Sequence, residues 1–152
     1  MATKRNEIRC ENSDLRIAVE KLNKTYFGGK LRIDTVGYFK EISMTTIGQA
    51  QWDHGFASDW YGLGVNPILK FAAKKLNFDL TETLLHELIH IWQYQNDKLD
   101  RDREGHGKWF NAKAMQIMEK SPEYKITRYA TKEESKLLNL LKTIRVNKAM
   151  GM

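Results

Sequence analysis

Apolar side chains recur at the spacing of an α-helix in four segments of the chain. The first predicted helix begins near Ser13 or Asp14 and ends at the paired glycines Gly28-Gly29, because glycine favours the end of a helix. The other predicted helices cover about residues 79–95, 108–119 and 131–147. Their inward-facing residues are Leu80, Leu84, Leu88 and Ile91 in the second, Phe110, Ala114, Ile117 and Met118 in the third, and Leu137, Leu138, Leu141 and Ile144 in the fourth.

Two of these helices begin with the spacing of a capping box, in which a polar residue and a carboxylate three positions later bond to each other's backbone N–H groups. Asp79 and Glu82 have this spacing in the second helix, with Asp in place of the usual Ser or Thr. Thr131 and Glu134 have it in the fourth. We therefore expect these pairs to form the first turns of their helices.

Between residues 31 and 65 the pattern changes to short runs of strand-forming residues separated by glycines and polar turns. Three strands are predicted near residues 33–39, 44–52 and 60–65. Short links without a helix favour antiparallel pairing of these strands. The order of elements predicts an α+β fold: an N-terminal helix, a three-stranded antiparallel sheet, then a histidine-bearing helix and further helices.

The composition fits a globular protein that works in a reducing compartment. The chain has 152 residues, of which 41% are hydrophobic, and one cysteine, Cys10, which excludes an internal disulfide and a zinc site built from several thiolates. The longest stretch without acidic or basic side chains, Ile42–Trp52, has 11 residues, whereas a membrane-spanning helix needs about 20 apolar ones. No apolar run follows the basic residues at the start of the chain, so we expect no secretory signal, no membrane contact and a cytoplasmic location.

Positive charge is concentrated near the end of the chain. The net charge is +6, and residues 120–152, with eight basic and three acidic groups, account for +5 of it. We expect residues 1–120 to form the core and residues 121–152 a basic helical extension packed on it. A basic region on a near-neutral body is typical of a protein that contacts nucleic acid, although it also occurs on an ordinary solvated surface.

The second predicted helix contains the sequence His86-Glu87-Leu88-Ile89-His90, which matches the pattern HExxH. On a helix the two histidines lie about 40° apart around the axis and about 6 Å apart along it, so both can bind one metal ion. Glu87 follows the first histidine, where its carboxylate can take a proton from water on a zinc ion. The pattern also occurs by chance, and a helix with two histidines is often only a helix.

A catalytic zinc site normally has three protein ligands, and the best candidate for the third is His106. It lies between two glycines at the start of the next predicted helix, and a charged loop allows the chain to reverse before it. The alternative is an ordinary histidine of a surface loop. Competing acidic ligands, which rank below His106, are Asp97, Asp100, Asp102 and Glu104.

Other candidate residues have weaker signals. His54 is predicted to lie in a turn between strands. The tryptophans Trp52, Trp60, Trp92 and Trp109 are expected in the core rather than as a platform for nucleic-acid bases. Tyr124 and Tyr129 are expected to be ordinary half-buried tyrosines, with the alternative that one donates its phenol to an oxyanion.

The chain resembles the SprT-like metallopeptidase domain, the family that includes the Spartan proteases of DNA–protein crosslinks. The resemblance covers about residues 15–118. Its main segments are Phe27-Gly28-Gly29-Lys30-Leu31, Val65-Asn66-Pro67, Glu82-Thr83-Leu84-Leu85-His86-Glu87-Leu88-Ile89-His90 and Asp102-Arg103-Glu104-Gly105-His106-Gly107-Lys108-Trp109-Phe110. It implies a zincin-like minimal metallopeptidase in which zinc is bound by His86, His90 and His106, and Glu87 is the general base.

The chain departs from the family pattern in two places. With Cys10 alone it has no four-cysteine zinc ribbon, and Lys108-Trp109 stand where the family commonly has Pro-Glu. Both departures leave the predicted zinc site intact.

Three functions follow from these patterns. The first is a zinc metalloendopeptidase of the HExxH type, a hydrolase that acts on protein substrates associated with or crosslinked to DNA and binds DNA without sequence preference. The second is the same peptidase with no role for DNA. The third is a non-catalytic DNA-binding or adaptor domain with a structural zinc ion. The presence of Glu87 favours the first two, because a structural zinc site has no use for a general base.

Overall fold

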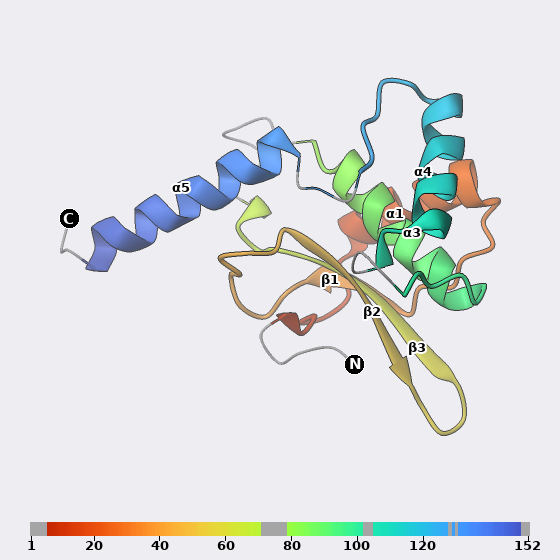
Figure 1. Cartoon of the computed structure of the whole chain (residues 1–152). Helices are drawn as coiled ribbons and strands as arrows, with labels where there is room; N and C mark the ends of the chain where they lie inside the picture. Colours follow the sequence, from red (N-terminus) through yellow and green to blue (C-terminus); the bar gives the residue numbers. More distant parts are fainter. Residues whose placement is uncertain (1–5, 71–78, 102–104, 128, 130, 150–152) are drawn as a thin grey trace.

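The computed structural model describes residues 6–70, 79–101, 105–127, 129 and 131–149. In chain order these residues form four helices and three strands (Figure 1). The elements are α1 (Ser13–Phe27), β1 (Thr35–Tyr38), β2 (Gly48–His54), β3 (Asp59–Val65), α3 (Thr81–Gln95), α4 (Lys108–Lys120) and α5 (Lys132–Ala149). The predicted α+β class is therefore confirmed.

Helix α1 begins and ends where the sequence predicts. The Asn12 side chain accepts a hydrogen bond from the Leu15 N–H at 3.0 Å, which satisfies one of the free donors of the first turn. Gly28 ends the helix in the left-handed conformation, with φ 65°, which glycine adopts without steric cost. The buried face of the helix consists of Leu15, Val19, Asn23 and Phe27.

The sheet is mixed, so the predicted antiparallel arrangement is wrong. The strand order is β1-β3-β2, with β2 antiparallel to β3 and β1 parallel to β3. Strands that are consecutive in sequence are neighbours only about two-thirds of the time, and here β1 pairs with β3 instead of β2. Here the most deeply buried strand, β3, takes the central place: Leu63 and Val65 are fully buried.

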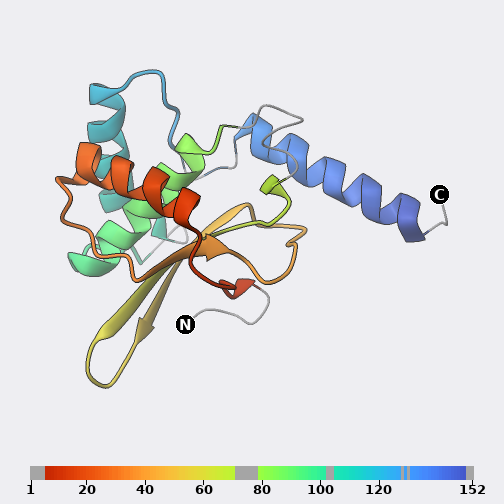
Figure 2. The ribbon, with the colours of Figure 1, turned by 180° about the vertical axis from the view of Figure 1, so that it is seen from behind.

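Helix α3 crosses one side of the sheet and packs against β2, and α1 and α4 lie beside it (Figures 1 and 2). Its inner face consists of fully buried leucines and isoleucines, namely Leu85, Leu88, Ile89 and Ile91. The burial of this face makes α3 the centre of the hydrophobic core. The HExxH residues are thereby held on a helix that the core fixes in place.

The predicted capping box of α3 is wrong. Asp79 Oδ1 accepts hydrogen bonds from the N–H and the hydroxyl of Thr81, at 2.9 and 2.7 Å, and the helix begins at Thr81 rather than Asp79. The Glu82 carboxylate accepts instead from the backbone N–H of Lys125. Glu82 therefore connects α3 to the segment after α4, a contact that local sequence does not specify.

The capping box of α5 is confirmed. Thr131 N–H donates to Glu134 Oε1 at 3.0 Å, and Glu134 N–H donates to Thr131 Oγ1 at 3.1 Å. Leu137 and Leu141 are buried as predicted, but Ile144 is 51% exposed. The prediction that Ile144 docks on the core is wrong, because α5 extends beyond the core after its first turns (Figures 1 and 2).

A search of the described helices finds none that combines the length and the apolar character needed to cross a bilayer.

Candidate metal centre

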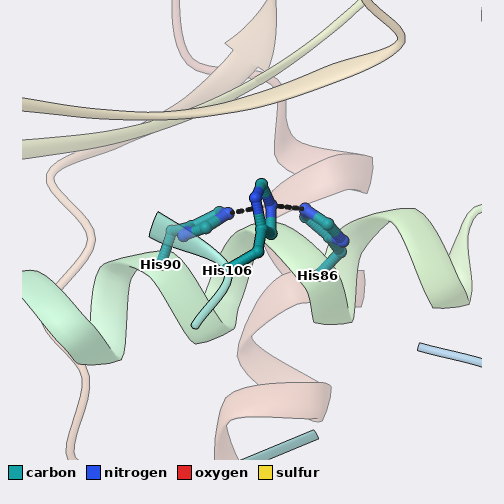
Figure 3. Close-up of side chains that lie close together, drawn as sticks. All are labelled: His86, His90 and His106. Atoms are coloured by element: carbon teal, nitrogen blue, oxygen red, sulfur yellow. Dashed lines mark hydrogen bonds between the residues drawn. The ribbon is translucent and has the colours of Figure 1, made fainter. Parts of the chain in front are cut away.

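Three histidines from two segments meet above α3 (Figure 3). His86 and His90 lie one turn apart on this helix, and His106 comes from the segment just before α4. The Nε2 atom of His106 lies 2.9 Å from Nε2 of His86 and 3.0 Å from Nε2 of His90. One possible ligand atom of each residue lies within 4.8 Å of the others, so the three histidines can hold a metal ion.

A buried glutamine, Gln93, connects α3 to the loop that carries His106. Its Nε2 donates to the backbone oxygens of Gly105 and Lys98, at 3.1 and 3.3 Å, and to Oδ2 of Asp100 at 3.0 Å. Its Oε1 accepts from Nδ1 of His90 at 2.7 Å. One side chain therefore orients a histidine of α3 and holds the backbone next to His106.

Asp100 fixes the start of α4 relative to this loop. Its two carboxylate oxygens accept from the backbone N–H groups of Trp109 and Phe110, each at 3.0 Å. These are free donors of the first turn of α4, and the residue at the N-cap position is Gly107, which has no side chain to cap them. Asp100 therefore caps α4 from outside the helix. His106 lies between Gly105, whose backbone oxygen is bound by Gln93, and the first turn of α4, which is bound by Asp100.

Gly105 forms a turn of the loop beside His90. Its φ is +82°, a backbone conformation that residues with a side chain rarely adopt. A Cβ atom at this position would lie 3.6 Å from Cε1 of His90. A Cβ atom would fit at this distance, so it is the turn, with its positive φ, that favours glycine before the third histidine.

The hydrogen bonds around the histidines leave the Nε2 lone pairs of His86 and His90 both facing Nε2 of His106. Nε2 of Gln93 has three oxygen acceptors, so its Oε1 is the acceptor for His90, and His90 carries its proton on Nδ1. His86 donates a hydrogen bond to the backbone of Thr127, and its Nε2 faces His106. One N–H of His106 can satisfy only one of these two acceptors. A cation bound by all three nitrogens satisfies the whole group, so these residues fit a metal ion.

Burial keeps the two histidines of α3 in the form that binds metals. It lowers the pKa of His86 to about 4, with a further contribution from His106, and lowers the pKa of His90 to about 4. The Phe110 ring packs against all three imidazoles, with ring centroids 4.8–5.1 Å apart. Both imidazoles of α3 are therefore neutral at pH 7, as metal ligation requires.

Glu87 lies beside the triad, held against the outer edge of β2. It is 9% exposed, and its Oε1 accepts from the Ala50 N–H at 3.1 Å. Burial raises the pKa of Glu87 to about 7, although His90 and the Ala50 N–H act in the opposite direction. A buried carboxyl group with a raised pKa is a stronger proton acceptor than an exposed one, which suits a general base.

The close approach of β2 to Glu87 depends on Gly48. A Cβ atom on this residue would lie 2.8 Å from Cγ2 of Thr83 and 3.3 Å from Cγ of Glu87. Only a residue without a side chain allows the strand to lie so near α3 at this point.

An open cleft of about 560 Å³ gives access to Glu87 and the triad. Its walls are Thr46 with β2, α3, and the loop that leads to His106. The residues that line it are Thr46, Gly48, Gln49, Ala50, His86, Glu87, His90, Tyr94, Leu99, Asp100, Arg101, Gly105 and His106. The predicted site residues therefore lie together in a place that an extended ligand can reach.

The other candidate residues lie elsewhere or have other roles. His54 ends β2, and its Nδ1 lies 2.6 Å from Asp59 Oδ1. Asp97 is exposed and Asp100 is used as a cap, while Asp102 and Glu104 lie outside the described residues. Of the two tyrosines, Tyr124 packs edge-on against Tyr26 and Tyr129 is 67% exposed; neither lines the cleft.

Sequence reasoning missed Gln93, the capping role of Asp100, Gly48 and Tyr94. A weak signal existed for Gln93: it is a polar residue three positions after His90, a spacing at which helical side chains meet. Trp109 was expected in the core but is 36% exposed, with Lys98 Nζ 4.2 Å from its ring centroid. Trp52 packs against the core as expected.

Fold and site together define a small α+β protein with an HExxH helix and a third histidine presented from a following loop. The model of the SprT-like family matches residues 15–130, and the chain belongs to this family.

Among curated proteins, the chain is similar to the DNA-dependent metalloprotease SPRTN of Homo sapiens, with 43% identity over 98 residues. That match covers 64% of this chain and 19% of the human protein. The proteins of the same name from Bos taurus and Rattus norvegicus are 50% identical over 44 residues, which is 29% of this chain and 8% of each relative. The chain thus spans about a fifth or less of the length of the relatives it matches. The comparison with solved structures gave no significant match.

Proposed function

We propose that this chain is a zinc-dependent endopeptidase in which His86, His90 and His106 bind the metal and Glu87 is the general base. The observation that carries the proposal is the position of Glu87: its buried carboxyl group, oriented by the Ala50 N–H, lies beside the three histidines in an open cleft. A structural zinc site is closed by four protein ligands, whereas the described residues offer three.

Three imidazoles and an open position are the ligand set of a catalytic zinc site. Held by these three histidines, zinc would polarise a peptide carbonyl and make water more acidic. Glu87 is placed to accept the proton of that water with a carboxylate oxygen and to return it to the leaving amine. The Ala50 N–H orients its carboxylate.

The free edge of β2 is suited to bind a peptide in extended form. Among the described strands β2 pairs only with β3, and the Ala50 N–H points away from β3 toward Glu87. Backbone groups alternate in direction along a strand, so those of Gly48 and Trp52 point to the same side as those of Ala50. Unpaired backbone groups at a strand edge recruit an extended segment by hydrogen bonding.

We further propose that the substrates are proteins associated with DNA, and that the chain contacts DNA through residues 121–152, an extension packed on the core formed by residues 1–120. The relatives are named DNA-dependent, and Lys136 and Lys142 are exposed on α5. Buried Ile126 and Leu137 support the packing of the extension on the core. The single cysteine, Cys10, is exposed, which fits a reducing, cytoplasmic setting.

The substitution Glu87→Gln tests the proposed chemistry. We expect the variant to keep its fold and its metal but to lose peptidase activity by a factor of about 10³ or more, because an amide cannot accept the proton of water. The assay measures cleavage of a DNA-bound protein, with and without DNA, and with a chelator as a control. Unchanged turnover in Glu87→Gln removes Glu87 from the mechanism. A zinc-loaded wild-type protein that cleaves nothing under any of these conditions is a non-catalytic domain.

A further inference from the structure

One end of the cleft is aromatic. Tyr94 lies one helical turn after His90, on the same side of α3, and lines the cleft. Its ring stacks on that of Trp52 in β2, with centroids 5.3 Å apart and planes inclined by 27°. A stacked neighbour fixes the orientation of a ring, so Tyr94 presents a rigid apolar wall.

A third apolar side chain completes this end of the cleft. Leu99, on the loop that leads to His106, also lines the cleft and is 47% exposed. Its Cδ1 lies 3.7 Å from the Cβ position of Gly105, so the leucine lies over the loop that packs on His90. Tyr94 and Leu99 therefore come from two different elements and border the same space.

The wall formed by Tyr94 carries no charge at neutral pH. Burial raises the pKa of Tyr94, and the nearby charge of Glu87 raises it further. A peptide side chain that enters here meets an aromatic ring and a leucine, which stabilise apolar groups by removing them from water.

We propose that Tyr94 and Leu99, with Trp52 behind Tyr94, form a subsite that selects a bulky apolar or aromatic side chain of the peptide substrate. The inference rests on the proposed peptidase function and adds the substrate preference of the same site. The subsite lies about 6 Å along α3 from His90, since residues four apart on a helix are separated by this distance. An extended peptide covers that distance in about two residues.

The direction of β2 decides on which side of the cleaved bond the selected residue lies. Gly48 lies near Thr83 and Glu87, and Trp52 lies near Tyr94, so β2 runs in the direction of α3. Antiparallel pairs outnumber parallel ones about two- to threefold, and a peptide paired antiparallel to β2 runs the opposite way. Its N-terminal part therefore lies at the Tyr94 end, and the subsite takes one of the two residues that precede the cleaved bond.

The experiment digests a mixed peptide library with the zinc-loaded full chain and identifies the cleavage sites by mass spectrometry. We expect Phe, Tyr, Leu and Met to be enriched at one of the two positions before the cleaved bond. For a matched pair of peptides with Phe or Ala at that position, kcat/KM should differ by about tenfold or more. Leu99→Ala and Tyr94→Ala should reduce this ratio severalfold, while Tyr94→Phe retains it.

Met115→Ala is the matched control, because Met115 is also an exposed apolar residue, 67% exposed, but lies on α4 away from the cleft. It should leave the ratio unchanged. Leu99→Ala keeps the test decisive if Tyr94→Ala does not fold, since Leu99 lies on a loop. Cleavage without apolar enrichment before the bond, or an unchanged ratio in Leu99→Ala, overturns the subsite and leaves the peptidase proposal standing. Absence of any cleavage by the wild type overturns the peptidase proposal itself.

Discussion

Gln93 connects the two segments that carry the histidines: α3, with His86 and His90, and the loop before His106. It is fully buried, and its amide group bonds to His90, Asp100 and the loop before His106. Hydrogen-bond partners of metal ligands fix the orientation of the ligand and typically change metal affinity by about 10–100-fold when removed. A leucine of similar volume cannot orient His90 or hold the loop.

We therefore predict that Gln93→Leu lowers zinc affinity by about 10–100-fold. The measurement is competition with a chromophoric chelator, together with the absorption spectrum of the cobalt-substituted protein, which reports the geometry of the ligands. Gln116→Leu is the control, since Gln116 contacts Lys113 on the exposed side of α4 and does not touch the site. His106→Ala provides the reference for loss of a whole ligand. Unaltered affinity and an unaltered cobalt spectrum in Gln93→Leu contradict the role of Gln93.

At the level of elements, the salt bridge between Glu11 and Arg16 connects α1 to β1, because both side chains also bond to the backbone of β1 or of the residues before it. Glu11 contacts the Arg16 guanidinium twice, at 2.6 and 3.0 Å, and accepts from the Val36 N–H at 2.8 Å. Arg16 also donates to the backbone oxygen of Ile33 at 2.8 Å. The Arg16 hydrogen bond, and to a lesser degree the Val36 N–H, hold the pKa of Glu11 below its ordinary value although burial opposes them.

We predict that Glu11→Gln lowers the free energy of unfolding at pH 7 by about 0.5–1 kcal/mol. A carboxyl group with a lowered pKa stabilises the fold fully above its unfolded pKa, about 4.3, and loses this effect as the pH falls through the folded value. The difference between variant and wild type should therefore be constant above about pH 5 and disappear at lower pH. Urea unfolding at several pH values measures it.

Glu20→Gln is the comparison for this prediction, because Glu20 has a single contact with Arg16, at 3.2 Å. Its effect should be smaller than that of Glu11→Gln. A Glu11→Gln deficit that does not shrink as the pH falls below the unfolded pKa of about 4.3 means that packing of the side chain, rather than its charge, joins α1 to β1.

At the level of the whole molecule, α5 separates from the core along its length. Leu137 and Leu141 are buried, whereas Leu140 and Ile144 are 43% and 51% exposed. Lys136 and Lys142 are exposed on this helix, while the side chains of Arg145 and Lys148 lie outside the described residues. The exposed lysines of α5 therefore lie on a helix that extends away from α1 and the rest of the core (Figures 1 and 2).

We predict that reversing Lys136 and Lys142 to Glu weakens DNA binding at low salt and makes it less dependent on salt. Each phosphate contact contributes about −0.9 to the slope of log affinity against log salt on duplex DNA, so losing two contacts should reduce the slope by about 2. Reversal of Lys21 and Lys24, which are exposed on α1, is the charge-matched control and should have little effect. Equal DNA binding by the α5 variant and the wild type would place the contact elsewhere.

The features that the sequence determined by itself are those set by contacts within one or two turns of the chain. The glycine pair ends α1, Thr131 and Glu134 cap α5, and the HExxH spacing puts His86 and His90 on one side of α3. Each depends on the preference of a residue for one backbone conformation or on the period of the helix. None of the three features depends on where distant parts of the chain lie, so all three are visible in the sequence.

The tertiary structure decided what depends on distant residues. It placed β3 in the centre of a mixed sheet, moved the start of α3 from Asp79 to Thr81, and left Ile144 exposed. It also brought His106 to the other two histidines through the bonds of Gln93 and the cap that Asp100 forms on α4. A bond between residues far apart in the chain forms only if the fold as a whole brings them together, and no local pattern records which pairs will meet.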